Sequence, residues 1–324
     1  MQFHRHIVTF AALALLGVQA NSFAGGATTP TLFYLNIRGS EVVRVNADGT
    51  NRQVIVSQKS FGPDGIVVDL AAGHIYWTNM GKASVDDGTV MRANLDGSEV
   101  TTIVPTAGTF TPKQLKLDAE HGKLYWSDRE GMRIMRANLD GSKIETLVVT
   151  GSGDADRKDA SHWCVGIALD VAHGKIYWTQ KGSDNAHKGT IKRASVEIPA
   201  GEDAAHRSDI EVLFANLPEP IDMDLDLSKQ MMYWTDRGDN TISRAPMYPN
   251  SLKPVDPAQR KDREILVRDL HEAIGITLDL KHNKMYYTAL GGEVGVAALN
   301  GKGARTLLDK QGALTGIAFV ELRR

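Results

Sequence analysis

Short runs of apolar and polar residues in alternation fill the chain from about residue 31 onward. The runs are four to seven residues long, are rich in β-branched and aromatic residues, and are separated by turns of Gly, Asp and Asn. Such runs predict β-strands joined by tight turns. No segment sustains the roughly 3.6-residue apolar period of an amphipathic helix, so we expect an all-β protein.

One block of residues recurs and divides the chain into units. Its six copies are LFYLN (32–36), HIYWTN (74–79), KLYWSD (123–128), KIYWTQ (175–180), MMYWTD (231–236) and KMYYTA (284–289). When the copies are aligned on their first tyrosine, they lie 42 to 56 residues apart, starting from Tyr34. This spacing is typical of the blades of a β-propeller.

Further residues recur at similar positions around the block in most units. An aspartate stands seven residues before the tyrosine, and we expect it to accept backbone hydrogen bonds in the turn that follows. These aspartates are Asp69, Asp118, Asp170, Asp226 and Asp279. An arginine lies on the strand after the block, and we expect it to form an ion pair between blades. These arginines are Arg44, Arg92, Arg136, Arg193 and Arg244. The tyrosine and the tryptophan alternate along one strand, so we expect them to pack on opposite faces of each blade.

One unit supplies four short antiparallel strands, and such a sheet cannot bury both of its faces alone. Six sheets packed face to face around an axis solve this problem, so we predict an all-β fold, a six-bladed β-propeller that forms a single domain over residues 31–320. No first strand precedes the first block, whereas LTGIAFV at 314–320 matches that missing strand. We therefore expect the C-terminal strand to complete the first blade in a 3+1 closure.

The Tyr-Trp-Thr-Asp block and the following Arg-Ala-Asn-Leu-Asp-Gly-Ser strand resemble the YWTD repeats, also called low-density lipoprotein receptor class B repeats. The resemblance covers about residues 31–320, with its cleanest copies at 76–98 and 125–142. It implies a six-bladed β-propeller that binds protein ligands or acts as a scaffold. The chain departs from the receptors because it lacks their EGF-like modules and disulfides, so it resembles a stand-alone exported propeller.

Residues 1–24 have the features of a secretory signal peptide. A weakly basic start precedes an apolar run from Ile7 to Val18, and small residues offer cleavage after Ala20 or Ala24. The apolar run is shorter than the ~20 residues that a membrane-spanning helix needs. We therefore predict a secreted or periplasmic protein without a membrane span.

Charge and cysteine content exclude several functions. The chain has 37 Lys and Arg against 39 Asp and Glu, a net charge of −2 that gives no basic surface for nucleic acid. A single cysteine, Cys164, excludes an intrachain disulfide framework and a CxxC metal site. We expect Cys164 to be a buried apolar residue.

Residues that differ between the units are the candidates for function. We call the end where the first strands begin and the second strands end the top face, and the opposite end the bottom face. On the first strands, Asp222 and Asp224 replace small residues of the other blades, and Lys116 is their candidate partner. The remaining candidates lie around the top mouth: Asp64, Lys113, Arg129, His162, Trp163, Glu219, Arg237, His271 and Glu272.

Three longer segments interrupt the repeat. The segment 151–166 begins with Gly-Ser-Gly but has no GxGxxG pattern, and we expect no helix after it, so dinucleotide binding is not predicted. We expect it to be a top loop that brings Trp163 toward the mouth. The connections at 195–209 and 247–264 belong to the bottom face, and the sequence does not distinguish mobile loops from partner-binding ones.

Two functions of different classes fit these observations. The first is a propeller that binds a protein or a small polar ligand at its top face, with no catalysis and no cofactor. The second is a propeller hydrolase, lactonase or lyase whose channel carboxylates hold a divalent cation or move protons. No GxSxG, HExxH or metal-spaced histidine cluster is present, so we predict the first. Carboxylates from different blades that converge on one point would favour the enzyme, and scattered carboxylates that each pair with an arginine would favour binding or a scaffold role.

Overall fold

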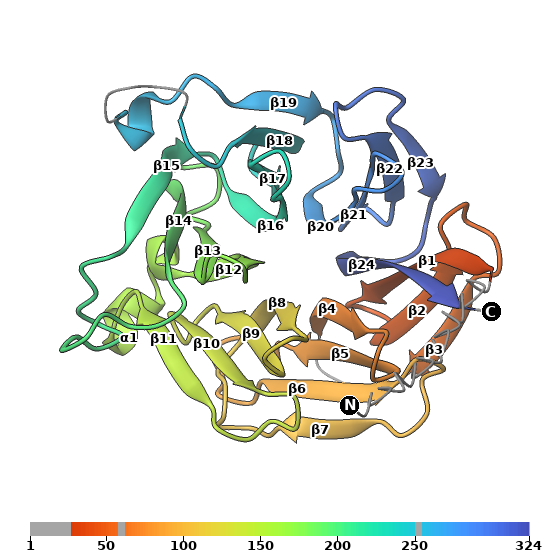
Figure 1. The fold of residues 1–324 in the computed structure, drawn as a ribbon, viewed down its shortest axis with the longest axis horizontal. Coiled ribbons are helices and arrows are strands. Elements are labelled where there is room, and N and C mark those ends of the chain that lie inside the picture. Colours follow the sequence, from red (N-terminus) through yellow and green to blue (C-terminus); the bar gives the residue numbers. More distant parts are fainter. Residues whose placement is uncertain (1–26, 58–61, 250–254, 324) are drawn as a thin grey trace, which may run out of the picture.

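A computed structural model of the protein describes residues 27–57, 62–249 and 255–323. Its strands form six four-stranded antiparallel sheets, which are arranged as blades around a common axis (Figure 1). The prediction of a six-bladed β-propeller is therefore confirmed. No helix in the described part of the chain combines the length and apolar character needed to cross a membrane.

The first three blades run as follows. Blade 1 contains β1 (Thr28–Asn36), β2 (Glu41–Asn46), β3 (Gln53–Ser57) and the C-terminal β24 (Leu314–Arg323). Blade 2 contains β4 (Pro63–Asp69), β5 (His74–Asn79), β6 (Thr89–Asn94) and β7 (Thr101–Val104). Blade 3 contains β8 (Pro112–Asp118), β9 (Lys123–Asp128), β10 (Arg133–Asn138) and β11 (Glu145–Val149).

The other three blades follow the same order. Blade 4 contains β12 (Cys164–Asp170), β13 (Lys175–Gln180), β14 (Gly189–Ser195) and β15 (Glu211–Leu217). Blade 5 contains β16 (Pro220–Asp226), β17 (Met231–Asp236), β18 (Thr241–Pro246) and β19 (Glu264–Val267). Blade 6 contains β20 (Ala273–Asp279), β21 (Lys284–Ala289), β22 (Val294–Ala298) and β23 (Arg305–Leu308).

The ring closes within blade 1. Strand β24 lies beside β1 and pairs with it antiparallel, from Thr28 opposite Arg323 to Asn36 opposite Leu314 (Figure 1). The predicted 3+1 closure by the C-terminal strand is confirmed. The predicted signal peptide at 1–24 lies outside the described residues.

Hydrophobic cores fill the gaps between neighbouring blades. Tyr76 packs in the core between blades 2 and 3, and its neighbour Trp77 packs in the core between blades 1 and 2. The same division holds for Tyr177 and Trp178. Alternation along a strand therefore gives every interface an aromatic residue from each of its two blades. The aromatic residues of the block hold the blades together, as the sequence predicts.

The first block departs from the predicted alignment by one residue. Phe33 lies opposite Arg44 in the β1–β2 pair, where Tyr76 lies opposite Arg92 in blade 2. Tyr34 therefore takes the position of the tryptophan and faces blade 6, and the alignment of Tyr34 with the other tyrosines is wrong. A shift of one residue exchanges the two faces of a strand, and both positions here are aromatic.

Buried hydroxyl groups join the inner strands of successive blades. Thr78 Oγ1 accepts the N–H of Gly65 at 2.9 Å and donates to Lys113 O of the next blade at 2.6 Å. The corresponding hydroxyls of the next four blades also donate to the first strand of the blade that follows: Ser127, Thr179, Thr235 and Thr288. Blade 1 has Leu35 at this position, and Thr315 Oγ1 of β24 donates instead to Pro63 O at 2.8 Å.

The outer strands are joined at a second level. In blades 1, 2, 3 and 6 the glycine of a tight turn lies against a carbonyl of the preceding blade's outer strand. The pairs are Gly49 with Leu307, Gly97 with Ile55, Gly141 with Ile103 and Gly301 with Leu266. In each outer strand this carbonyl belongs to the third residue. Gly97 and Gly141 have φ of 86° and 82°, so these positions favour glycine for conformation as well as for space.

In blades 4 and 5 the long connections replace this turn. Arg207 donates to Leu147 O of blade 3 at 2.9 Å and to Ser195 O of its own blade at 2.7 Å. Arg260 makes the same pair of contacts, to Leu213 O at 3.2 Å and Pro246 O at 2.8 Å. Both guanidinium-bearing side chains are almost fully buried. One role of the 195–209 and 247–264 connections is therefore to attach each blade to the one before it.

The recurrent aspartates act as predicted, whereas most of the recurrent arginines do not. Asp69 Oδ1, for example, accepts the N–H of Ala72 at 2.9 Å. The other four accept the backbone N–H three residues on in the same way.

Arg136 pairs with Glu197 of the next blade at 2.6 Å. Arg193 and Arg244 instead pair with glutamates on the adjacent strand of their own blade, so the expectation of ion pairs between blades is wrong for them.

The segment after β11 contains two short helices. They are α1 (Gly153–Arg157) and the 3-10 helix Ala160–His162. The expectation that no helix follows the Gly-Ser-Gly sequence is therefore wrong. The helix has only five residues, because Asp156 caps Ser152 N and the chain then turns back toward β12. A second 3-10 helix, Pro257–Gln259, lies in the long connection of blade 5.

Candidate functional site

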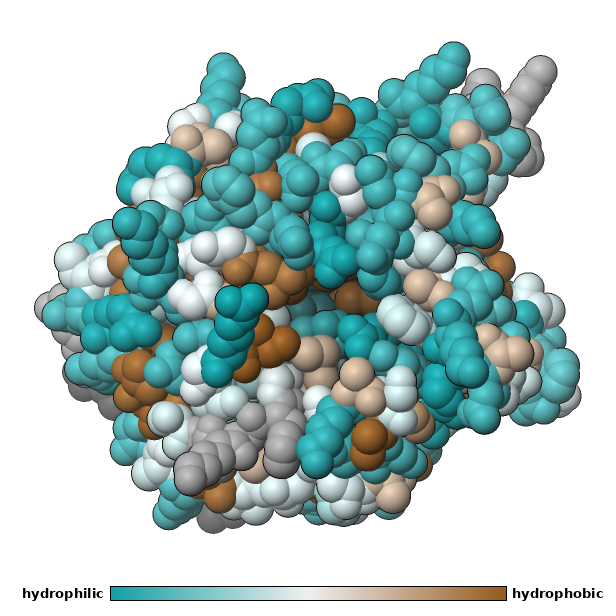
Figure 2. All heavy atoms as spheres, turned by 180° about the vertical axis from the view of Figure 1, so that it is seen from behind, coloured by the Kyte–Doolittle hydropathy of each residue, from teal (hydrophilic) through white to brown (hydrophobic). Residues whose placement is uncertain are grey.

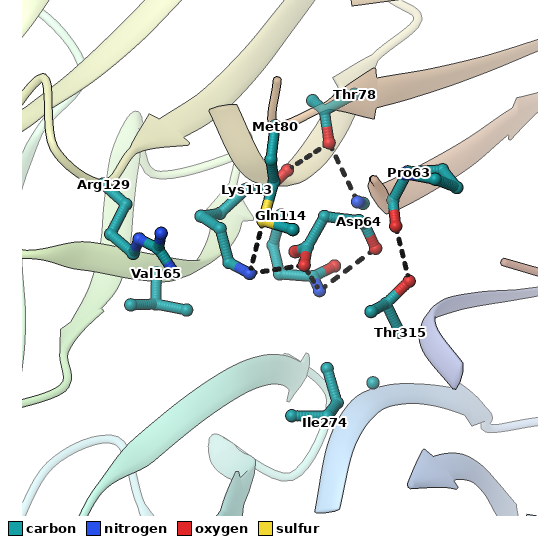
Figure 3. A network of polar contacts seen from close by, with 12 residues as sticks. Pro63, Asp64, Thr78, Met80, Lys113, Gln114, Arg129, Val165, Ile274 and Thr315 are labelled. Atoms are coloured by element: carbon teal, nitrogen blue, oxygen red, sulfur yellow. Dashed lines mark hydrogen bonds and ion pairs between the residues drawn. The ribbon is translucent and has the colours of Figure 1, made fainter. Parts of the chain in front are cut away.

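The second residue of each first strand lies at the top of the inner ring. The six residues at this register position are Asp64, Lys113, Val165, Ile221, Ile274 and Thr315. Figure 3 shows Asp64, Lys113 and Gln114 gathered on one side, with Val165 and Ile274 across from them. The mouth therefore has a polar half, from blades 1 to 3, and an apolar half, from blades 4 to 6.

A buried ion pair dominates the polar half. Lys113 Nζ bonds to Asp64 Oδ2, and Gln114 Nε2 donates to Asp64 Oδ1 at 3.2 Å. Lys113 Nζ also lies 3.1 Å from the sulfur of Met80. Burial lowers the pKa of Lys113, although the charge of Asp64 opposes this change. Both partners are withdrawn from water, so the pair has little freedom to rearrange.

The apolar half is a compact hydrophobic cluster. Val165, Ile221 and Ile274 pack together, with the partly buried Leu290 against them. Leu290 also lines a hollow of about 630 Å³ on the top face, together with Leu270 and the exposed Arg38. Figure 2, which views the ring from behind, shows hydrophobic atoms at the rim of a central hollow. Such a surface can accept an apolar side chain from a partner.

Trp163 stands beside this cluster as a half-buried aromatic residue. The guanidinium of Arg129 lies 5.0 Å from the centre of its ring, and the ammonium of Lys181 lies 5.6 Å from it. The indole Nε1 donates to Arg157 O at 2.9 Å, which fixes the orientation of the ring. Two cations and one backbone contact thus hold a partly exposed indole at the mouth.

Glu219 connects Trp163 to blade 5. Its carboxylate accepts from Lys181 Nζ at 2.5 Å and from Arg237 Nε at 3.1 Å. Arg237 also reaches Asp184 at 3.3 Å and Glu272 at 4.0 Å. The carboxylate of Glu219 is almost fully buried, whereas Arg237 stays about one-third exposed. This chain of charges leaves the guanidinium of Arg237 accessible at the rim.

The two histidines predicted for the mouth are engaged separately. His162 Nδ1 bonds to Thr150 O. His271 Nδ1 bonds to Glu293 on the far side, in blade 6. The structure therefore does not bring His162 and His271 together, nor does it place either against Asp222.

Asp222 and Asp224 each accept a hydrogen bond from the next blade, a contact that the sequence analysis did not predict. Asp222 Oδ2 accepts the N–H of Ile276 at 3.0 Å, and Asp224 Oδ2 accepts that of Leu278 at 3.2 Å. The carboxylates thus satisfy two backbone donors on the free inner edge of β20. Burial raises the pKa of Asp222 to about 7, although Lys116 and the two N–H donors oppose this.

Lys116 is the partner of Asp224 in the structure, with Nζ 3.5 Å from Oδ1. Burial alone would lower the pKa of Lys116, but Asp224 and Asp222 together raise it. This pair lies away from Trp163 and Arg237, so the twelve predicted residues form separate groups. A mouth group contains Asp64, Lys113, Arg129, Trp163, Glu219 and Arg237, with Glu272 at its rim.

Comparison with known proteins identifies the family. The chain is 40% identical over 300 residues to "Low-density lipoprotein receptor-related protein 1" of Pyricularia oryzae, which covers 88% of this chain and 94% of that protein. The chain belongs to the low-density lipoprotein receptor-related YWTD propeller family. It is also 35% identical to "3-hydroxyacyl-CoA dehydrogenase-like protein LAM1" of Cochliobolus heterostrophus over 90% of this chain, and it spans 65% of that protein.

Solved structures agree on the fold of this YWTD propeller. The chain superposes on one in a nidogen/laminin complex with a TM-score of 0.68 and 22% identity, covering 90% of this chain and 98% of that one. No protein-family model matches the sequence.

Four candidate carboxylates of this YWTD propeller each have a partner in the structure. Asp64 pairs with Lys113, Asp224 with Lys116, and Glu219 with Lys181. Asp222 is held by backbone N–H groups. Among the described residues, no three or more His, Cys, Asp or Glu side chains gather closely enough to hold a metal ion. Scattered carboxylates are what a binding or scaffold role predicts, although the partners named here are lysines and not the expected arginines. The absence of a cofactor stays a prediction.

Sequence reasoning missed several residues of the mouth in this YWTD propeller. It omitted Gln114 and the apolar residues Val165, Ile221 and Ile274. The shared position of the three apolar residues was the signal, because residues one place before the repeated glycine all reach the same level of the ring. Asp184 and Arg157 carried no such signal, since both lie in segments that differ between blades.

Proposed function

We propose that this chain is an exported, protein-binding propeller that receives its partner at the top mouth. The observation that carries the proposal is the position of Trp163 between Arg129 and Lys181, with the accessible Arg237 beside it. Tryptophan and arginine are the residues that contribute most to the centre of protein interfaces. The indole here is already oriented by its bond to Arg157 O, so little freedom is lost on binding.

The surroundings of Trp163 support a protein partner. The hollow lined by Leu270 and Leu290, with Leu290 packed against the buried cluster of Val165, Ile221 and Ile274, offers a place for one apolar side chain. Charges of both signs surround it, since Glu219, Arg237 and Glu272 lie in one chain of contacts. An apolar centre with a polar rim is the usual composition of such interfaces. The similar propeller of known structure belongs to a nidogen/laminin complex, which is consistent with this use of the fold.

Binding can be tested with a matched pair of aromatic variants. Tyr248 is the control, because it is an exposed aromatic residue with Arg193 4.3 Å from its ring but follows β18 on the bottom face. Immobilised protein is used to capture partners from the extracellular fraction of the source, and each captured protein is purified and its Kd measured. We expect W163A to weaken binding by roughly tenfold or more and Y248A to leave it unchanged.

Two results would contradict the proposal. One is a purified partner whose Kd is unaffected by W163A and by R237A. The other is binding that is lost equally in Y248A. Circular dichroism of each variant separates loss of binding from loss of fold.

Export is proposed from the signal-like residues 1–24. The full chain is expressed in a secreting host, and the mass of the protein in the medium is measured. We expect a new N-terminus after Ala20 or Ala24. Retention of the full-length mass inside the cell would contradict export without affecting the proposal for the top mouth.

A further inference from the structure

A second pocket lies on the bottom face, at the end of the blades opposite to the mouth residues. Blades 3 and 4 enclose about 460 Å³ between the bottom ends of β9 and β10 and those of β13 and β14. Figure 1 shows these two blades side by side in yellow and green. This volume suits one small organic molecule.

Two lysines of this pocket have only neutral partners. Lys123 Nζ donates to Asn138 Oδ1 at 2.7 Å, and Lys175 Nζ donates to Ser195 Oγ at 3.1 Å. Neither forms an ion pair with a carboxylate in the described part of the chain. Both side chains belong to half-buried residues at the start of a strand. Glu197 and Glu211 interact with Lys123 and Lys175 only through longer-range charge attraction, so both ammonium groups keep N–H donors for a ligand.

The acidic residues of the pocket already have ion-pair or hydrogen-bond partners. Glu197 pairs with Arg136 at 2.6 Å, and Asp118 accepts from the backbone and ring of His121. The bond from Asp118 to His121 Nδ1 leaves the other ring nitrogen, Nε2, without a partner among the described residues. The groups in this pocket with hydrogen-bonding capacity left for a ligand therefore include the two ammonium groups.

The remaining wall of the pocket is apolar. Leu169, Val171 and Val196 line it, and all three are half-buried. A ligand that fits would carry an anionic group for the lysines and an apolar portion for this wall. Free ions such as phosphate lack the second property.

We propose that the pocket between blades 3 and 4 binds a small organic carboxylate with an apolar end. The carboxylate lies against Lys123 and Lys175, and the apolar end covers Leu169 and Val171. This site is independent of the protein-binding role of the top mouth.

The groove between blades 6 and 1 provides an internal comparison. It lies at the equivalent place between two other blades. His282 and Lys284 correspond there to His121 and Lys123 of the pocket. Blade 1 contributes no second lysine there and adds Asp48 instead. We expect no carboxylate binding in this groove, which makes Lys284→Met a matched control.

Calorimetric titration of the full chain tests the proposal. The probes are hexanoate and benzoate, with hexanamide and benzamide as uncharged counterparts of the same shape. We expect both carboxylates to bind and the amides to bind at least roughly tenfold more weakly, because the amides lack the charge that the ammonium groups pair with. K123M/K175M should lose the preference for the carboxylates, and K284M should retain it.

Binding of the amides with equal affinity would overturn the proposal, as would unchanged affinity in K123M/K175M. Absence of binding by either carboxylate at millimolar concentration would also overturn it. Thermal unfolding of K123M/K175M checks that the variant folds. If it does not, the single variants K123M and K175M are titrated in its place.

Discussion

Lys116 and Asp224 form an ion pair between two blades that are not neighbours in the ring. Lys116 lies on β8 of blade 3 and Asp224 on β16 of blade 5, and their charged atoms are 3.5 Å apart. Blade 4 has the small Ala168 at the corresponding position, which leaves room for this contact. The charge of Lys116 also acts on Asp222, two residues before Asp224, so the titration of Asp222 is coupled to a cation two blades away.

The stability of the protein should depend on the ionisation of Asp222. Its pKa is about 7 in the folded state, against an ordinary value of 3.8. Between these values unfolding releases a proton, so the contribution of Asp222 to stability is present below about pH 4 and is lost as the pH rises to 7. We expect the free energy of unfolding, measured with urea from pH 4 to pH 8, to fall less steeply in D222N than in the wild type.

A second variant checks the cause of this pH dependence. Lys116 lowers the pKa of Asp222, so this pKa should rise above 7 in K116M. The loss of stability should then continue to a higher pH than in the wild type. Parallel pH profiles for the wild type, D222N and K116M would show that Asp222 does not titrate in this range.

Removal of Arg207 should weaken the attachment of blade 4 to blade 3. The R207A variant loses hydrogen bonds to three backbone carbonyls and leaves Asp209 without its cation. We expect a loss of roughly 3 kcal/mol in the free energy of unfolding. R38A is the control, because Arg38 is exposed and makes no contact among the described residues, and it should change stability by less than about 0.5 kcal/mol. Equal effects of R207A and R38A in urea unfolding would refute this role.

The hydroxyl of Thr315 should contribute less to stability than that of Thr78. Both donate to the first strand of a neighbouring blade, but only Thr78 also accepts a backbone N–H, that of Gly65. Valine keeps the shape of threonine and removes the hydroxyl. We expect a loss of about 1 kcal/mol for T315V and about 2 to 3 kcal/mol for T78V, measured by urea unfolding. The reverse order would contradict this account of the inner ring.

Cys164 should be unreactive in the folded protein. Its side chain is fully buried, and burial raises the pKa of its thiol to about 12. Because only the thiolate reacts, we expect Ellman's reagent at pH 8 to modify no thiol in native protein and one thiol per chain in urea. Rapid modification of native protein would show that the start of β12 opens in solution.

The repeat made the fold predictable, because a position that recurs in five or six units lies at the same place in each blade. The aspartates illustrate this, since Asp69 and Asp279 both accept the backbone N–H of the third residue on. The alignment of blade 1 failed because Phe33 and Tyr34 are both aromatic. Only the pairing of Phe33 with Arg44 reveals which of the two faces blade 2.

The site was less predictable, because it combines side chains from several blades. The sequence placed Glu219 and Arg237 near one mouth, but it could not show that Lys181 would share the carboxylate. The orientation of Asp222 could have been anticipated. Its counterpart in blade 2 is Gly65, and a Cβ at Gly65 would meet the backbone of Gln114 in the next blade. A side chain at this position must therefore point toward the neighbouring blade.

The pairing of β24 with β1 also determines how the molecule unfolds locally. In a linear array of repeats, the terminal units have one neighbour each and fray first. Here every blade has two neighbours, and the contacts at Thr315 and Gly49 continue the inner and outer rings through blade 1. Opening any one blade breaks two interfaces together. Slow amide exchange should therefore extend evenly around the circle, with no blade serving as the weak end.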